Sequence, residues 1–186
     1  IDDAHVLKLD PGVDIDSVTL AQQLGTVIFA AKRLPESLES QTCLVVGQGS
    51  AGLFWDFILT HLGAEKIISI EPLHWRRELG ITYGADETID ATGDSATRAV
   101  KELTDGLGAD LVIEAVGSTP TLSQAFHLVR DEGQVVLFGL PESEEPVPFD
   151  YSQMFRSRAS AFTVLGSQDE SGLTSYVEAV RTITSG

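Results

Sequence analysis

Residues 45–52 read VVGQGSAG, and the apolar segment FWDFILTHLG follows two residues later. The glycines Gly47, Gly49 and Gly52 have the spacing G-x-G-x-x-G. A strand, a glycine-rich turn and a helix in this order predict a binding site for the diphosphate of a dinucleotide. We expect Gly47 to permit the tight turn, Gly49 to let a phosphate approach the backbone, and Gly52 to let the helix pack close to the strand.

The residues that follow the glycines complete the expected site. At the start of the helix, the N–H groups of Ser50 and Ala51 are free to bind an anion. Glu71 ends the second predicted strand, where a carboxylate can accept both ribose hydroxyls of an adenosine. It would also repel a 2′-phosphate, by about 4 kcal/mol for unit charges 4 Å apart at an effective dielectric constant of 20. NAD is therefore favoured over NADP, although Arg76 is close enough in sequence to pair with a 2′-phosphate.

Strands and helices alternate along the rest of the chain. We expect six strands, at residues 42–47, 66–71, 87–90, 109–116, 134–139 and 161–166. Their apolar runs lack clean alternation, which is typical of strands buried on both faces. Strands joined by helices predict parallel pairing with right-handed crossovers. The expected fold is therefore α/β, a doubly wound six-stranded parallel sheet of the Rossmann type, with its ligand at the carboxyl ends of the strands.

Local signals predict where individual elements begin and end. Residues 5–9 (HVLKL) are expected to form a short strand, and a helix is expected from about Ser17. Ser95 and Thr119 have the residue type that caps helix N-termini. Gly133 is expected to end the helix that Thr119 begins.

Composition excludes several classes of partner. The chain has 186 residues, 28 acidic against 12 basic side chains, and a net charge of −16. Nucleic acid and anionic membrane surfaces are unexpected partners because both need clustered Lys and Arg. The single cysteine, Cys43, allows no internal disulfide. No apolar stretch reaches the roughly 18 residues of a membrane span, so we expect a cytoplasmic protein. Since the chain opens with Ile1, we also expect it to be a piece of a longer protein.

The segments VVGQGSAGLF, LGAEKIISIEP, YGADETID, LGADLVIEAVGS and DEGQVVLFGLPES, in this order, resemble the medium-chain, zinc-type alcohol and polyol dehydrogenases. The similarity runs from about Ser17 to the end of the chain. It implies that residues 17–186 are the dinucleotide-binding domain of that family. Residues 1–16 would then be a linker or edge segment of the catalytic lobe, which precedes this domain in the family.

The resemblance implies further residues beside the cofactor. Gly117 would lie near the ribose, and Val116 beside it would also contact the cofactor. Three residues would flank the nicotinamide carboxamide, namely Phe138, Gly139 and Leu140. Thr26 would pack beside the nicotinamide ring. In the family the sixth strand pairs with a second subunit, so the resemblance also implies a homodimer.

The zinc ligands of the family are not expected in this chain. The catalytic lobe normally supplies a cysteine and a His-Glu pair, and the position aligned with a third ligand is Gln22. Glutamine is a poor zinc ligand because it brings no charge. The four histidines, His5, His61, His74 and His127, lack the spacing of metal ligands. Zinc is expected only in a full-length parent protein.

Several functions remain open on the sequence alone. The first is the cofactor-binding domain of an NAD-dependent dehydrogenase that moves a hydride between a hydroxyl-bearing carbon of a small alcohol or carbonyl substrate and nicotinamide. Such a fragment is expected to bind NAD(H) without turnover. The alternatives are a stand-alone NAD-sensing regulatory module and a zinc-free NADPH-dependent quinone or enoyl reductase. A methyltransferase is disfavoured because Val45 and Val46, rather than an acid, precede the glycines.

Overall fold

The computed structural model describes residues 6–142, 145–168 and 170–185. The chain forms two compact units. One unit comprises Ser37–Val164, and the other combines Ile1–Glu36 with Leu165–Gly186.

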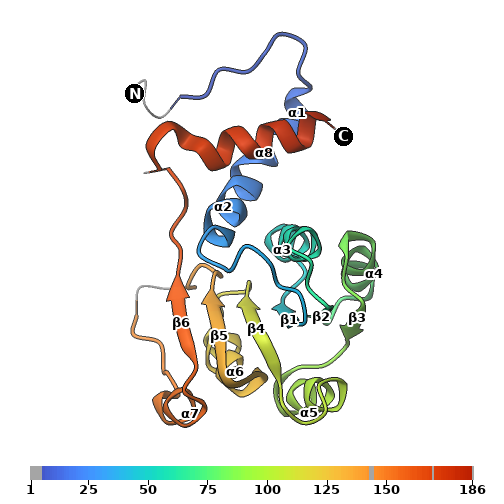
Figure 1. Ribbon diagram of the computed structural model, residues 1–186, viewed down its shortest axis with the longest axis vertical. Coiled ribbons are helices and arrows are strands. Elements are labelled where there is room, and N and C mark those ends of the chain that lie inside the picture. The colour runs from blue at the N-terminus through green and yellow to red at the C-terminus, as the bar shows by residue number, and fades with distance from the viewer. Residues whose placement is uncertain (1–5, 143–144, 169, 186) are drawn as a thin grey trace. The chain divides into compact units, whose positions relative to one another are not determined.

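The unit Ser37–Val164 is built on a six-stranded sheet with the order β3-β2-β1-β4-β5-β6. Every neighbouring pair of strands is parallel, which confirms the predicted doubly wound fold (Figure 1). The strands are β1 (Thr42–Val46), β2 (Lys66–Ile70), β3 (Glu87–Ile89), β4 (Ala109–Glu114), β5 (Val129–Leu137) and β6 (Ser160–Thr163). The direction of strand order reverses between β1 and β4, so the ends of these two strands mark the switch point of the sheet.

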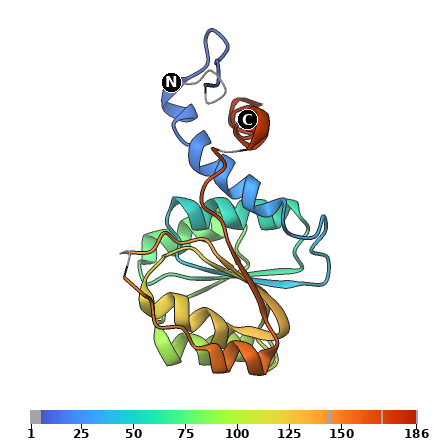
Figure 2. The same cartoon turned by 90° about the vertical axis from the view of Figure 1, so that its left-hand side faces the viewer.

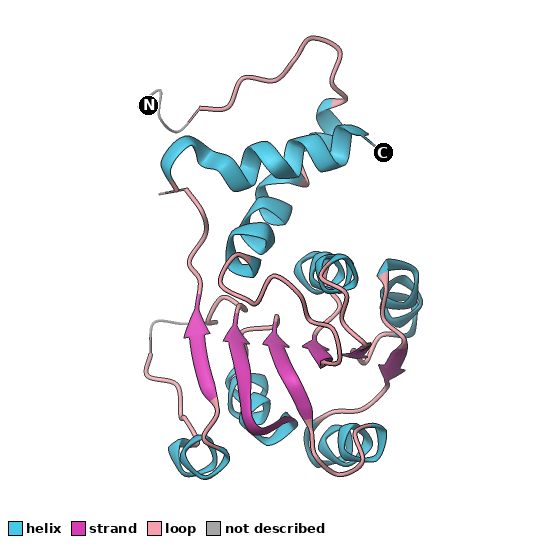
Figure 3. Cartoon of the chain, viewed as in Figure 1, coloured by secondary structure: helices cyan, strands magenta, loops and turns pink. Residues whose placement is uncertain are grey.

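Helices cover both faces of this sheet. They are α3 (Ser50–His61), α4 (His74–Tyr83), α5 (Gly93–Leu103), α6 (Thr119–Leu128) and α7 (Tyr151–Ser157). Figure 2 shows α3 and α4 on one face and α5, α6 and α7 on the other. Figure 3 separates the strands from the loops that join them to these helices. Because both faces are covered, β1 and β4 are almost completely buried, which explains their continuous apolar sequence.

Two expectations near the N-terminus are wrong. Residues 6–9 form no strand, and residue 5 lies outside the described residues. The helix expected from about Ser17 is two helices, α1 (Ile15–Val18) and α2 (Ala21–Ala31). The first begins early because the carboxylate of Asp14 accepts hydrogen bonds from the backbone N–H groups of Asp16 and Ser17.

The expected N-caps of α5 and α6 are also wrong. Helix α5 begins at Gly93, and the hydroxyl of Ser95 instead donates to the carbonyl of Thr92, 2.7 Å away. Helix α6 is capped by Ser118, whose Oγ accepts from the N–H of Thr121, so Thr119 is the first helical residue. In both helices a neighbouring residue with similar capping ability occupies the cap.

Gly133 does not end α6. The helix ends at Leu128, and β5 begins directly at Val129, which pairs with Ala109 of β4. A Cβ at Gly133 would lie 2.8 Å from the carbonyl oxygen of Asp110. Gly133 therefore allows a close approach of β5 to β4, not a helix end.

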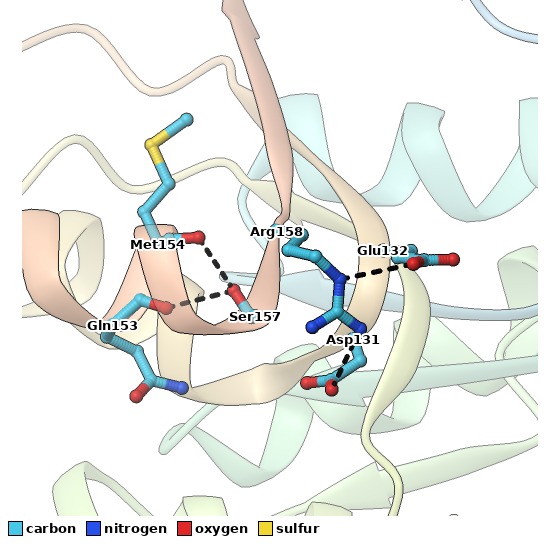
Figure 4. A network of polar contacts seen from close by, with 6 residues as sticks. All are labelled: Asp131, Glu132, Gln153, Met154, Ser157 and Arg158. Atoms are coloured by element: carbon cyan, nitrogen blue, oxygen red, sulfur yellow. Dashed lines mark hydrogen bonds and ion pairs between the residues drawn. The ribbon is translucent and has the colours of Figure 1, made fainter.

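The connection from α7 into the edge strand β6 is held by side chains (Figure 4). Arg158 adopts a left-handed conformation with φ of 55°. Its guanidinium lies 3.3 Å from Asp131 and 3.1 Å from Glu132. The hydroxyl of Ser157 donates to the carbonyls of Gln153 and Met154 in the preceding turn. The two exposed ion pairs of Arg158 each contribute only about 0.2–1 kcal/mol to the stability of the fold.

In the second unit, α2 packs against α8 (Thr174–Ser185). A Cβ at Gly25 would lie 2.2 Å from the ring of Tyr176, so only glycine fits at this contact. Lys32 lies 2.8 Å from Glu170. Burial alone would raise the pKa of Glu170, but the Lys32 ammonium and the N–H of Ser175 hold it at about 2. No helix among the described residues is both long and apolar enough to cross a membrane.

Candidate functional site

A cavity of about 850 Å³ lies at the carboxyl ends of β1, β2 and β4. Its walls include the loops that follow these strands and the first turns of α5 and α6. Five residues predicted for the site line it: Gly47, Gly49, Glu71, Arg76 and Val116. This place is the switch point of the sheet, and the volume falls in the usual range for a small-molecule site.

The three glycines of the loop between β1 and α3 have different surroundings. Gly47 has a φ of +93°, which favours glycine, and a Cβ there would lie 2.5 Å from the side chain of Val116. A Cβ at Gly52 would lie 1.9 Å from the carbonyl oxygen of Gly47, so α3 approaches the loop more closely than any side chain allows. At Gly49 a Cβ would meet nothing within 4 Å, so the backbone faces open space.

The N-terminus of α3 begins beside this open space. Gly49 is the N-cap, and no side chain caps the helix. Ser50, Ala51 and Gly52 form the first turn, whose N–H groups have no partner within the helix. With the helix dipole, these groups form a site suited to an anion.

Glu71 joins the glycine loop to the end of β2. Its side chain is buried, and Oε2 accepts from the N–H of Gln48 at 2.9 Å while Oε1 accepts from the N–H of Leu73 at 3.0 Å. A carboxylate offers about four acceptor positions, so it can also accept hydroxyl groups from the cavity that it lines. The bond to Gln48 was not expected from the sequence, which gives the strand-end acid but not the path of the loop.

The two arginines after β2 point to different partners. Arg76 lines the cavity, and its guanidinium lies 3.7 Å from Oε2 of Glu71. Arg77 contacts Asp90 at 3.0 Å and donates to the carbonyls of Glu71 and Pro72. Arg76 is therefore the cation of this pair that is available to a ligand.

The loops after β4 and β5 are in backbone contact. A Cβ at Gly117 would lie 2.0 Å from the carbonyl oxygen of Leu140, and one at Gly139 would lie 2.1 Å from the nitrogen of Gly117. The buried Glu114 supports this arrangement, because its Oε1 accepts from the N–H groups of Val116 and Gly117 at 3.0 and 2.9 Å. Sequence reasoning missed Glu114, although an acid at the end of an apolar strand was a usable signal.

The remaining predicted residues are placed as follows. The ring of Phe138 packs edge-on against Trp55, with ring centroids 5.5 Å apart. Leu140 is exposed. Thr26 belongs to the unit that combines Ile1–Glu36 with Leu165–Gly186, where its hydroxyl donates to the carbonyl of Gln22 at 3.1 Å. Its contact with a nicotinamide ring stays a prediction.

The described residues contain no metal-binding cluster. No group of three or more His, Cys, Asp or Glu side chains among them could hold a metal ion. His61, His74 and His127 each contact a different partner: the carbonyl of Phe57, Glu78 and Asp150. His5 lies outside the described residues. His127 also lines the cavity, a position that its sequence context did not indicate.

Comparisons with known proteins identify the family to which the chain is similar. A family model described as zinc-binding dehydrogenase matches residues 52–183. An L-threonine 3-dehydrogenase of Pyrococcus abyssi is 29% identical over 162 residues, which make up 87% of this chain and 45% of that protein. A probable D-xylulose reductase A of Aspergillus fumigatus is 30% identical over 145 residues, or 76% of this chain and 40% of that protein.

The solved structures give the same result. An alcohol dehydrogenase from Thermotoga maritima matches with a TM-score of 0.81 and 30% identity, covering 96% of this chain and 49% of that one. An alcohol dehydrogenase from Thermus sp. ATN1 matches with a TM-score of 0.80 and 26% identity. The chain thus spans about half the length of the proteins that it matches.

Proposed function

The chain belongs to the zinc-binding, medium-chain alcohol dehydrogenase family, where it corresponds to the cofactor-binding domain, and from that premise we propose that its cofactor is NAD. The parent protein would transfer a hydride between a hydroxyl-bearing carbon and the nicotinamide. One observation carries the proposal: the cavity at the switch point is lined by both Gly49, at the bare start of α3, and Glu71. A dinucleotide needs an anion site and a sugar-binding acid side by side.

Different residues would bind the diphosphate and the adenosine ribose of this cofactor. The diphosphate would lie against Gly49, where a Cβ would meet open space, and against the N–H groups of Ser50 and Ala51 in the uncapped first turn of α3. The adenosine ribose would donate its hydroxyls to Glu71, whose carboxylate is already oriented by two backbone N–H groups. When bound, the nicotinamide supplies the acceptor or donor of the hydride.

The predicted contacts to the nicotinamide half come from the loops after β4 and β5. We propose that Gly117 lies near the ribose, that Val116 contacts the cofactor beside it, and that Phe138, Gly139 and Leu140 flank the carboxamide. The backbone contact between Gly117 and Leu140 supports this, because it holds the two loops together. Thr26 is proposed beside the nicotinamide ring on the family resemblance alone.

We propose that the catalytic groups lie outside the described residues. The described residues offer no zinc site, so any zinc would be held by residues outside them. The dehydrogenase relatives are about twice as long as this chain. We therefore propose that the 186-residue chain binds NAD(H) and a parent protein contributes the substrate site.

A homodimer through β6 is also proposed. The strand lies at the edge of the sheet, and edge strands can pair with a second copy. Tyr151 and Phe155, on the helix that precedes β6, are both exposed and pack against each other with ring centroids 5.9 Å apart. Sedimentation equilibrium of the chain would measure its oligomeric state, and a monomer at micromolar concentration would contradict this part.

Titration of the chain with NADH tests the main proposal. We expect saturable binding, followed by nicotinamide fluorescence, with NADPH bound at least tenfold more weakly because Glu71 repels a 2′-phosphate. Equal or tighter binding of NADPH would mean that Arg76 decides the preference and would favour an NADPH-dependent reductase. No binding at millimolar NADH would contradict the proposal.

A further inference from the structure

A buried polar cluster lies next to the glycine loop. The side chains of Gln48, Asp56 and Ser69 come from the loop, from α3 and from β2, and all three are completely buried. The hydroxyl of Ser69 lies 3.0 and 3.1 Å from the two carboxyl oxygens of Asp56. Buried polar groups that lack a complete set of partners are uncommon, so this cluster needs an explanation.

Gln48 is the incomplete member of the cluster. Neither Oε1 nor Nε2 of its buried amide has a hydrogen-bond partner in the described structure. A Cβ at Gly80 of α4 would lie 2.8 Å from Oε1 of Gln48 and 3.6 Å from Oδ2 of Asp56. The amide and the carboxyl group therefore both lie against Gly80, where a side chain would collide with the amide oxygen.

Asp56 has no cation beside it. Burial raises its pKa to about 8, and the Ser69 hydroxyl and the nearby Gln48 amide only partly oppose this effect. The elements around α3 carry other titratable groups, but none contributes to the shift: Cys43 on β1, Lys66 on β2, Glu71 after β2, His61 on α3 itself, and His74, Arg76, Arg77, Glu78 and Tyr83 on α4. At neutral pH Asp56 is therefore mostly the uncharged acid.

The protonated and ionised forms of Asp56 act differently on the loop. The Gln48 amide has both an acceptor oxygen and N–H donors, so it can face either form of Asp56, and the two forms differ in the negative charge that only the carboxylate carries. The carboxyl group of Asp56 is hydrogen-bonded to Ser69 of β2 and borders the Gln48 amide of the loop, and Gln48 in turn donates its backbone N–H to Glu71. Asp56 also lies six residues after Ser50, about 9 Å along α3. Its ionisation places a negative charge below the proposed diphosphate site.

We propose that Asp56 is a positioning residue for the dinucleotide: its protonated side chain supports Gln48 in the glycine loop, and loss of the proton weakens binding. This inference rests on the proposed function, because it takes a diphosphate as the ligand of the loop. By linkage, a bound diphosphate must in turn favour protonation of Asp56.

The test measures NADH binding to the 186-residue chain between pH 7 and pH 9.5. We expect the Kd of the unsubstituted chain to rise about tenfold over this range, as for charges about 9 Å apart at an intermediate dielectric constant. The variant Asp56→Asn keeps the shape and cannot ionise, so its Kd should change less than twofold. Asp131→Asn, an exposed substitution on β5, is the matched control and should keep the full pH dependence.

A second measurement needs no variant. Calorimetric titration with NADH at pH 8, in two buffers with different ionisation enthalpies, gives the number of protons taken up on binding. We expect a net uptake of a fraction of one proton per NADH. Zero uptake, or an Asp56→Asn variant with the same pH dependence as the unsubstituted chain, would overturn the inference alone. Absence of NADH binding at every pH would overturn the proposed function together with it.

Discussion

Glu71 and Gln48 are joined by a hydrogen bond of 2.9 Å between a carboxylate oxygen and a backbone N–H. The acid follows β2 and the glutamine lies between the first two glycines after β1, so one bond connects the two loops of the proposed adenosine site. The same carboxylate is 3.7 Å from the guanidinium of Arg76. The position of Glu71 is thus set by its backbone partners before any ligand binds.

Replacement of Glu71 by glutamine tests the role of its charge. Glu71→Gln keeps an acceptor but loses the negative charge, so ribose hydroxyls bind less strongly and a 2′-phosphate is no longer repelled. We expect the Kd for NADH to rise about tenfold, or about 1.4 kcal/mol, and the preference for NADH over NADPH to shrink. Parallel titrations with both nucleotides measure this. Glu65→Gln, an exposed substitution before β2, should change neither value.

Gly49 and Gly52 offer a test that separates binding from folding. The φ of Gly49 is −73°, and a Cβ there meets nothing within 4 Å, so Gly49→Val should cost only the loss of a favourable N-cap residue, about 1 kcal/mol of unfolding free energy. It places methyl groups where the diphosphate is proposed to lie, so we expect NADH binding to weaken at least tenfold. Urea unfolding and NADH titration measure the two quantities.

Gly52→Ala, measured in the same way, is expected to affect mainly the stability of the fold. Its Cβ would lie 1.9 Å from the carbonyl oxygen of Gly47, so α3 must move away from the loop. We expect a loss of about 2 kcal/mol or more in unfolding free energy. If Gly49→Val bound NADH as tightly as the unsubstituted chain, the space beside Gly49 would not be the diphosphate site.

The fold was predictable from the sequence because its signals are local and repeated. Each apolar strand is followed by a turn and a helix, and the spacing of Gly47, Gly49 and Gly52 indicates the first crossover. The ends of helices were less predictable, because adjacent residues compete for one cap. Ser118 and Thr119 can both accept from an N–H group, and only the path of the chain decides that Ser118 does.

The candidate site was predictable only in part. Gly49, Glu71 and Arg76 follow from the motif and from the strand-end position. Asp56 and Glu114 do not, because their roles depend on long-range packing that buries a carboxyl group in an apolar segment. An acid within an apolar helix or strand is a signal that something unusual is buried, but it does not identify the partner.

Glu114 is expected to control the order of the loop after β4. Glu114→Gln replaces a carboxylate that accepts from Val116 and Gly117 with a neutral amide. Hydrogen bonds to a charged group contribute about 1.5–3 kcal/mol, so we expect a loss of about 1–2 kcal/mol in unfolding free energy. Amide hydrogen exchange at Val116 and Gly117 should become faster. Unchanged exchange at these two amides would show that the carboxylate does not hold the loop.

The pH dependence of stability provides an independent test of Asp56. Burial raises the pKa of Asp56 to about 8 in the folded chain, from an ordinary value of 3.8, so between these values the folded state keeps a proton that the unfolded state has released. The unfolding free energy contributed by this group therefore falls as the pH rises from about 4 to about 8, and then levels off. Because asparagine does not ionise, this pH-dependent loss of unfolding free energy is absent in Asp56→Asn.

Urea unfolding of the unsubstituted chain and of Asp56→Asn at pH 5 and pH 8 measures this difference in stability. We expect Asp56→Asn to gain stability relative to the unsubstituted chain at the higher pH, while the other titrating groups cancel in the comparison. Asp131→Asn should show no such gain, because its carboxylate is exposed and paired with Arg158. Equal stability differences between Asp56→Asn and the unsubstituted chain at the two pH values would mean that Asp56 is ionised in the folded state, and that its burial does not keep the proton.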